Sequence, residues 1–100
     1  MEEKYTENPE IITRVDVVQS KMMIEISLID VEKEDINLMM DEKGFFLSAP
    51  TESGTDYVAA VSFLRSVKPS EAKAVLGEGY LKVEVPFKDP LENYIKVVVE

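Results

Sequence analysis

The chain has 100 residues, of which 45% are hydrophobic and 31% charged, and this is the composition of a single globular domain. Its net charge of −9 and its scattered basic residues argue against binding to nucleic acid or to an anionic membrane. His and Cys are absent, so the commonest general base, the strongest nucleophile and the usual zinc ligands are all missing. These absences predict a protein that is not an enzyme and that needs no cofactor.

The first ten residues are acidic and show no apolar periodicity. We therefore predict a flexible acidic N-terminal arm over 1–10, followed by one domain over 11–100. The N-terminal sequence lacks the basic start and the apolar run of a secretory signal, and no stretch is apolar enough to cross a bilayer as a helix. With no Cys for disulfides, the expected location is the cytoplasm.

Apolar residues recur at every second position through most of the remaining chain. The clearest run is Met22, Ile24, Ile26 and Leu28. This alternation is typical of a β-strand with one buried face. About eight such short strands at turn-like spacing predict an all-β sandwich or barrel. The other runs occupy 15–17, 36–40, 45–49, 57–63, 72–76, 81–85 and 95–99.

Two of the connections have a recognisable form. Asp41–Gly44 separates two alternating runs, which predicts a hairpin. Pro69–Leu76 has good helical propensity, but Gly77 and Gly79 follow too soon for a stable helix. We therefore predict a single turn there, leading into a strand.

Four carboxylates lie within the six residues from Asp30 to Asp35. A calcium loop of the helix-loop-helix type needs ligands at alternating positions, an internal Gly and a later Glu, and this spacing is not present. The cluster is therefore interpreted as a solvated turn between two strands. An enzyme built on Ser, Lys or paired carboxylates is the least favoured hypothesis, because no catalytic motif surrounds these residue types.

Methionines occur in two adjacent pairs, at 22–23 and 39–40. Neighbouring residues of a strand point to opposite faces, so only one Met of each pair can enter the core. The other, Met23 or Met39, then lies on a second face that is either covered by another element or open to a partner.

The segment from Ala74 to Pro86 resembles the Ala-x-x-x-x-Gly-x-Leu signature near the end of the alpha-crystallin domain of small heat shock proteins. The segments 33–38 and 46–49 are similar to two earlier strands of that family. The resemblance covers about Val15 to Val99 and implies an antiparallel immunoglobulin-like β-sandwich of about eight strands. The signature positions are Ala74, Gly79 and Leu81.

Small heat shock proteins are ATP-independent chaperones of the stress response that hold non-native proteins on exposed apolar surface. The resemblance therefore implies a holdase whose partners are unfolded or partly folded proteins. It places a docking groove between the strand 36–40 and the strand around 72–75. The alternative for each groove residue is a place in the ordinary core. The groove residues that the resemblance implies are Ile36, Leu38, Met40 and Val75.

Two departures from the family pattern bear on assembly. Members outside animals commonly carry a long loop with a strand that swaps between dimer partners, whereas only Pro50–Asp56 joins the corresponding strands here. The family's C-terminal docking motif, Ile-x-Ile/Val, has the spelling Ile95-Lys96-Val97, but its alternation predicts a last strand rather than a docking tail. Self-association is therefore expected to be small. The alternative function is a co-chaperone like the CS-domain proteins, acting on a larger chaperone as a monomer or small dimer.

Overall fold

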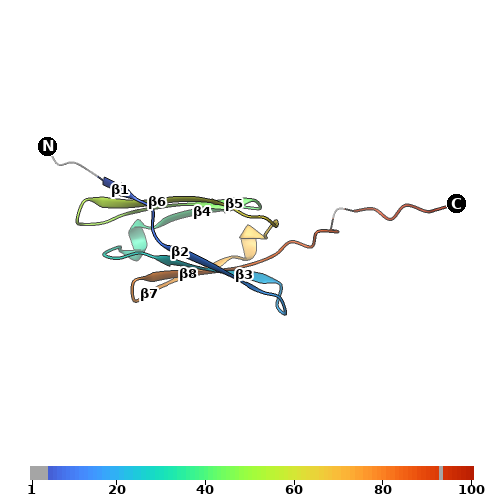
Figure 1. The fold of residues 1–100 in the computed structure, drawn as a ribbon, viewed down its shortest axis with the longest axis horizontal. Coiled ribbons are helices and arrows are strands. Elements are labelled where there is room, and N and C mark those ends of the chain that lie inside the picture. Colours follow the sequence, from blue (N-terminus) through green and yellow to red (C-terminus); the bar gives the residue numbers. More distant parts are fainter. Residues whose placement is uncertain (1–4, 93) are drawn as a thin grey trace.

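The structure is a computed structural model that describes residues 5–92 and 94–100. The strands of these residues form two four-stranded sheets that pack face to face (Figure 1). One sheet has the strand order β1-β6-β5-β4 and the other has the order β2-β3-β8-β7. Neighbouring strands are antiparallel except for β1 and β6, which are parallel. The predicted antiparallel immunoglobulin-like β-sandwich of about eight strands is confirmed.

The elements follow one another along the chain with short connections. Two 3₁₀ turns, η1 and η2, lead into β4 and β7. Within the described residues no helix is both long and apolar enough to span a membrane. The elements are β1 (Tyr5–Glu7), β2 (Ile11–Asp16), β3 (Lys21–Ser27), η1 (Lys33–Asp35), β4 (Asn37–Asp41), β5 (Gly44–Pro50), β6 (Thr55–Ser62), η2 (Pro69–Glu71), β7 (Lys73–Gly77) and β8 (Tyr80–Pro86).

The core lies between the two sheets and consists of alternate residues of the central strands. In β3, Ile24 and Ile26 are buried while the residues between them are partly exposed. Leu47 of β5 faces them from the other sheet and is also fully buried. Burial of each such side chain contributes about 1.5–3 kcal/mol relative to exposure. The alternation read in the sequence is therefore the pattern that holds the two sheets together.

The methionine pairs are divided as the alternation predicts. Met22 is buried in the core, whereas Met23 is partly exposed on the other face of β3. Met40 packs against the core, and Met39 is exposed on the outer face of β4.

Both predicted connections are confirmed. β4 and β5 pair from Asn37–Ser48 to Asp41–Gly44, which makes the hairpin. The side chain of Asp41 accepts a hydrogen bond from the backbone N–H of Lys43 at 2.7 Å and closes the turn. The segment that begins at Pro69 forms one 3₁₀ turn and then enters β7.

The link between β5 and β6 is a tight local turn. β5 ends at Pro50 and β6 begins at Thr55, and the backbone N–H of Thr51 donates to the carbonyl of Thr55 at 3.1 Å. The two strands it joins pair with each other in the same sheet. This turn therefore carries no strand that could swap into a neighbouring molecule.

The N-terminal segment differs from the prediction of a flexible acidic arm over 1–10, because part of it forms a strand. Tyr5–Glu7 forms β1, which pairs in parallel with Thr55–Tyr57 of β6. All three residues of β1 are exposed, so the backbone ladder rather than side-chain burial defines this strand. Such pairing leaves no apolar pattern by which the sequence could reveal it.

The prediction of a last strand at 95–99 is wrong. Residues 94–100 form no strand, and they extend away from the sandwich (Figure 1). Ile95 is 88% exposed and Val97 is 78% exposed. The radius of gyration of 16.9 Å exceeds the value of about 13 Å for a compact 100-residue domain, as a projecting tail requires. We call residues 94–100 the C-terminal tail.

Candidate apolar docking groove

An apolar groove runs along one open side of the sandwich, between β4 at the edge of one sheet and β7 at the edge of the other. Each wall begins at a 3₁₀ turn. Ile36 caps η1, and its backbone N–H donates to the carbonyl of Lys33 at 3.3 Å; Ala72 caps η2 in the same way. The two turns lead the chain into β4 and β7, the strands that form the walls of the groove.

The groove encloses about 430 Å³. Ile36 and Leu38 are half-buried on the β4 side and pack against the core. Leu76 pairs with the buried Leu81 across the β7–β8 ladder, so both lie on the inner face and form the floor. Val75 pairs with the exposed Lys82 and is itself 67% exposed, which places it on the rim. Apart from Lys33, the groove is therefore apolar from floor to rim.

The structure brings together most of the residues that the sequence implied. Ile36, Leu38 and Val75 line the groove, as do the signature residues Ala74 and Leu81. Met40 does not, because it lies at the turn end of β4 and lines a separate cavity with Phe45 and Val61. Gly79 lies in the β7–β8 turn with a φ of +85°, a backbone conformation that favours glycine.

Sequence reasoning missed two lining residues, Lys33 and Leu76. Leu76 could have been found from the β7–β8 register, because pairing Gly77 with Tyr80 sets it opposite Leu81. Lys33 had no such signal, since its place depends on the 3₁₀ turn that folds the acidic segment back toward β4.

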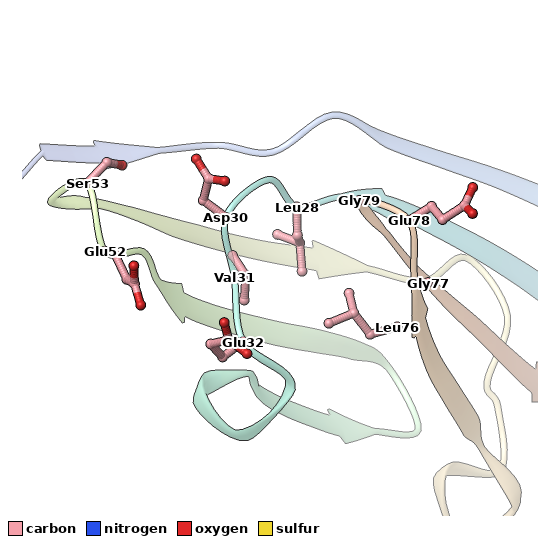
Figure 2. Close-up of a pocket in the computed structure, with 10 residues that line it drawn as sticks. All are labelled: Leu28, Asp30, Val31, Glu32, Glu52, Ser53, Leu76, Gly77, Glu78 and Gly79. Atoms are coloured by element: carbon pink, nitrogen blue, oxygen red, sulfur yellow. The ribbon is translucent and has the colours of Figure 1, made fainter.

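A larger cavity of about 690 Å³ adjoins the groove and shares Leu76 with it. Its lining includes four carboxylates, and Figure 2 shows those of Asp30, Glu52 and Glu78 pointing in different directions, with Leu28 and Leu76 between them. Among the described residues no three acidic side chains gather as a metal site requires. The four carboxylates of this cavity outnumber Lys33 of the groove, so the end of the groove beside the cavity is negative.

The groove has the chemistry of a docking site for an extended peptide. It offers apolar side chains for alternate residues of a strand, and an acidic end that favours a basic residue in its occupant. The tail presents a segment of this kind, because Ile95 and Val97 flank Lys96 and would share one face in an extended conformation.

The two-sheet fold defines the class of architecture: it is a β-sandwich similar to that of solved heat shock proteins. Heat shock protein 16.0 from Schizosaccharomyces pombe superposes with a TM-score of 0.69 at 14% identity, covering 94% of this chain and 99% of that one. A point mutant of hsp14.1 from Sulfolobus solfatataricus P2 gives a TM-score of 0.69 at 11% identity, covering 92% and 78%. The Del-C4 mutant of the same protein gives 0.63 at 13% identity, covering 79% and 77%. No family model and no curated protein matches the sequence.

Proposed function

We propose that this protein is an ATP-independent holdase that binds non-native proteins through apolar surface. The observation that carries the proposal is the solvent-open groove between β4 and β7, where Ile36 and Leu38 are half-buried and Val75 on the rim is 67% exposed. An open apolar groove between two sheet edges can receive an extended segment of a partner. The likeness of the fold to heat shock proteins supports this choice of partner.

The net charge of −9 suits this activity. A holdase that has bound an unfolded protein must remain dispersed, and strong net charge opposes the association of such complexes. Binding through preformed apolar grooves needs no nucleotide, because the occupant is exchanged by mass action alone. The activity is therefore non-enzymatic.

The tail is proposed to dock in the groove of another copy. Its exposed apolar residues match the groove in alternation, and Lys96 suits the acidic end of the groove. Docked tails would cover the grooves when no non-native protein is present, and they would leave when one competes. Self-association is then small, because the tight turn after Pro50 removes the other common route to assembly.

The co-chaperone hypothesis is favoured by one observation, the short turn between β5 and β6. A sandwich that cannot exchange a strand can act as a monomer on a larger chaperone. A tail that docks on another copy argues for the holdase instead, so the two hypotheses separate on whether the chain self-associates.

The proposal is tested by the thermal aggregation of an unfolding client enzyme, followed by light scattering without ATP. We expect suppression by the wild-type chain and a loss of most of it in the variant Val75→Asp. Val75 is a rim residue, so a carboxylate there places charge in the docking surface without entering the core.

The matched control is Met39→Asp, which changes an exposed residue on the outer face of β4. It should suppress aggregation as the wild type does. If the wild-type chain fails to suppress aggregation at molar excess, the holdase proposal is wrong. If both variants lose the same amount of suppression, the groove is not the binding site.

A further inference from the structure

A second apolar cleft lies on the opposite open side of the sandwich, between β2 and the end of β6. It encloses about 340 Å³, and its lining includes Val15, Val61, Phe63 and Leu64. Val15 is 55% exposed and Leu64 is fully exposed, so much of this lining is in contact with solvent. The cleft shares no lining residue with the groove between β4 and β7.

Both sheets offer an unpaired strand edge at this cleft. β2 is the outermost strand of its sheet. β6 is paired by β1 only along Thr55–Tyr57, and no described strand covers that edge from Val58 to Ser62. An extended segment can therefore continue the line of β1 along β6, with its backbone hydrogen-bonded and its side chains over the cleft.

The β2–β3 hairpin extends this apolar surface. The side chain of Asp16 accepts a hydrogen bond from the backbone N–H of Gln19 at 3.0 Å, and this turn holds Val17 and Val18 outward. Val18 is 95% exposed, and neither valine belongs to the core or to the residues packed against it. The hairpin tip thus adds two β-branched residues to the surface beside Val15, where they have no packing role.

The cleft differs from the groove in charge. Among the described residues that line it, Arg65 is the only charged one. Its guanidinium lies 4.0 Å from the centre of the Phe87 ring, which fixes its position while leaving its N–H groups able to donate. No carboxylate of the described residues lies within salt-bridge distance of Arg65, although the chain carries a net charge of −9.

We propose that this cleft is a second docking site, for extended apolar segments of non-native proteins that carry a carboxylate beside their apolar residues. The segment adds to the β6 edge, its apolar side chains fill the space around Val15 and Phe63, and its carboxylate accepts hydrogen bonds from Arg65. The inference rests on the proposed holdase function and assigns bound segments of opposite charge to two different sites. The groove beside the acidic cavity takes segments with basic residues, and the cleft takes segments with acidic ones.

Two fluorescent peptides with the same alternating Val-Leu core, one ending in two Asp and the other in two Lys, test this by anisotropy titration at low salt. We expect Val15→Asp to weaken binding of the Asp-ended peptide about tenfold or more, because the substitution places a carboxylate in an apolar contact. Val75→Asp, the same change at the other site, should leave that peptide unaffected. Leu64→Asp repeats the test at a fully exposed residue, so that the effect on peptide binding can still be measured if Val15→Asp does not fold.

The charge preference is tested by Arg65→Glu. The substitution should weaken binding of the Asp-ended peptide and strengthen binding of the Lys-ended peptide, each by about threefold, as expected for a solvent-exposed ion pair. Lys68→Glu makes the same charge change at a residue that lines neither the groove nor the cleft, and it should leave the ratio of the two affinities unchanged. An Arg65→Glu effect no larger than that of Lys68→Glu would overturn the assignment of the carboxylate.

Other outcomes also decide the matter. Loss of the Asp-ended peptide in Val75→Asp but not in Val15→Asp would assign binding to the groove and overturn the proposal. Tighter binding at the cleft by a peptide copied from residues 94–100 would assign the cleft to a second copy of this chain instead. Peptide binding that follows the expected pattern supports the cleft even where client aggregation is not suppressed, so failure of the holdase function is seen separately.

Discussion

Gly44 opens β5 at a point where the backbone of β6 passes very close. A Cβ atom placed on Gly44 would overlap the carbonyl oxygen of Val61, and that oxygen belongs to the strand ladder and cannot move aside. We therefore expect Gly44→Ala to lower the free energy of unfolding by about 1–3 kcal/mol, the usual cost of overpacking. Urea denaturation followed by circular dichroism measures this change.

Gly77 provides the matched control, because a Cβ there would meet no atom within 4 Å. Gly77→Ala should leave the stability unchanged or raise it slightly, since alanine restricts the unfolded chain. Equal destabilisation by the two substitutions would show that the close approach of β6 is not the reason for glycine at position 44.

At the residue scale the sequence predicts the core better than the rim. Ile24 and Leu47 could be assigned because alternation marks residues that face inward on a central strand. Met40 shares the alternation of Ile36 and Leu38 but lines a different cavity, since the position of a residue along the strand, not its face, decides which opening it reaches. Which opening a strand position reaches depends on how the two sheets stack, and no local sequence pattern encodes the stacking.

At the element scale, Lys88 ties the root of the tail to the β4–β5 turn. Its Nζ lies 2.9 Å from Glu42 Oε1 and 3.6 Å from Glu92 Oε2. The hydrogen bond to Glu42, together with the negative charges of Glu42 and Glu92, raises the pKa of Lys88 above its ordinary value of 10.5 although partial desolvation opposes this. The protonated amine is therefore favoured by folding.

This shift predicts how the contribution of Lys88 depends on pH. A raised pKa in the folded state stabilises the fold fully below the unfolded value of 10.5, and the contribution is lost as the pH rises through the higher folded value. We expect Lys88→Met to melt below the wild type at pH 8, with the difference in Tm shrinking as the pH is raised above 10.5. Thermal melts at pH 8 and at a higher, alkaline pH measure it.

Lys82→Met serves as the control for the alkaline melts, since Lys82 is an exposed residue in the middle of β8. Its Tm difference from the wild type should be small and similar at both pH values. A Lys88→Met difference that persists undiminished at the higher pH would mean that packing of the lysine stem, and not its charge, secures the root of the tail.

The elements that the sequence predicted wrongly lie at the two ends of the described chain, for opposite reasons. β1 has no buried residue, so backbone pairing with β6, about fifty positions away, leaves no mark on its side chains. The tail alternates Ile95, Val97 and Val99 as a strand does, yet none of the strands of the described residues pairs with it. Alternation indicates which face of a segment is apolar, but a strand forms only where a neighbouring strand can hydrogen-bond with its backbone.

At the scale of the whole molecule, the open sides of the sandwich and the tail decide how copies of the chain associate. The groove and the cleft lie on opposite sides of the sandwich. The tail extends away from both sheets (Figure 1), so in this conformation its apolar residues do not pack on their own sandwich. If tails dock on grooves, then association is set by Ile95 and Val97, which share one face of the tail.

We therefore expect the double substitution Ile95→Ser with Val97→Ser to shift the chain toward the monomer. Each serine removes an apolar side chain that docking would bury, and the two together would weaken tail docking by about 3–6 kcal/mol if burial were complete. Light scattering on a gel-filtration column over a range of concentrations measures the mass. Val98→Ser changes a residue on the other face of the tail and should leave the mass as in the wild type. A wild-type chain that stays monomeric at every concentration would contradict docking between copies, and it would favour a co-chaperone that meets its partner as a single sandwich.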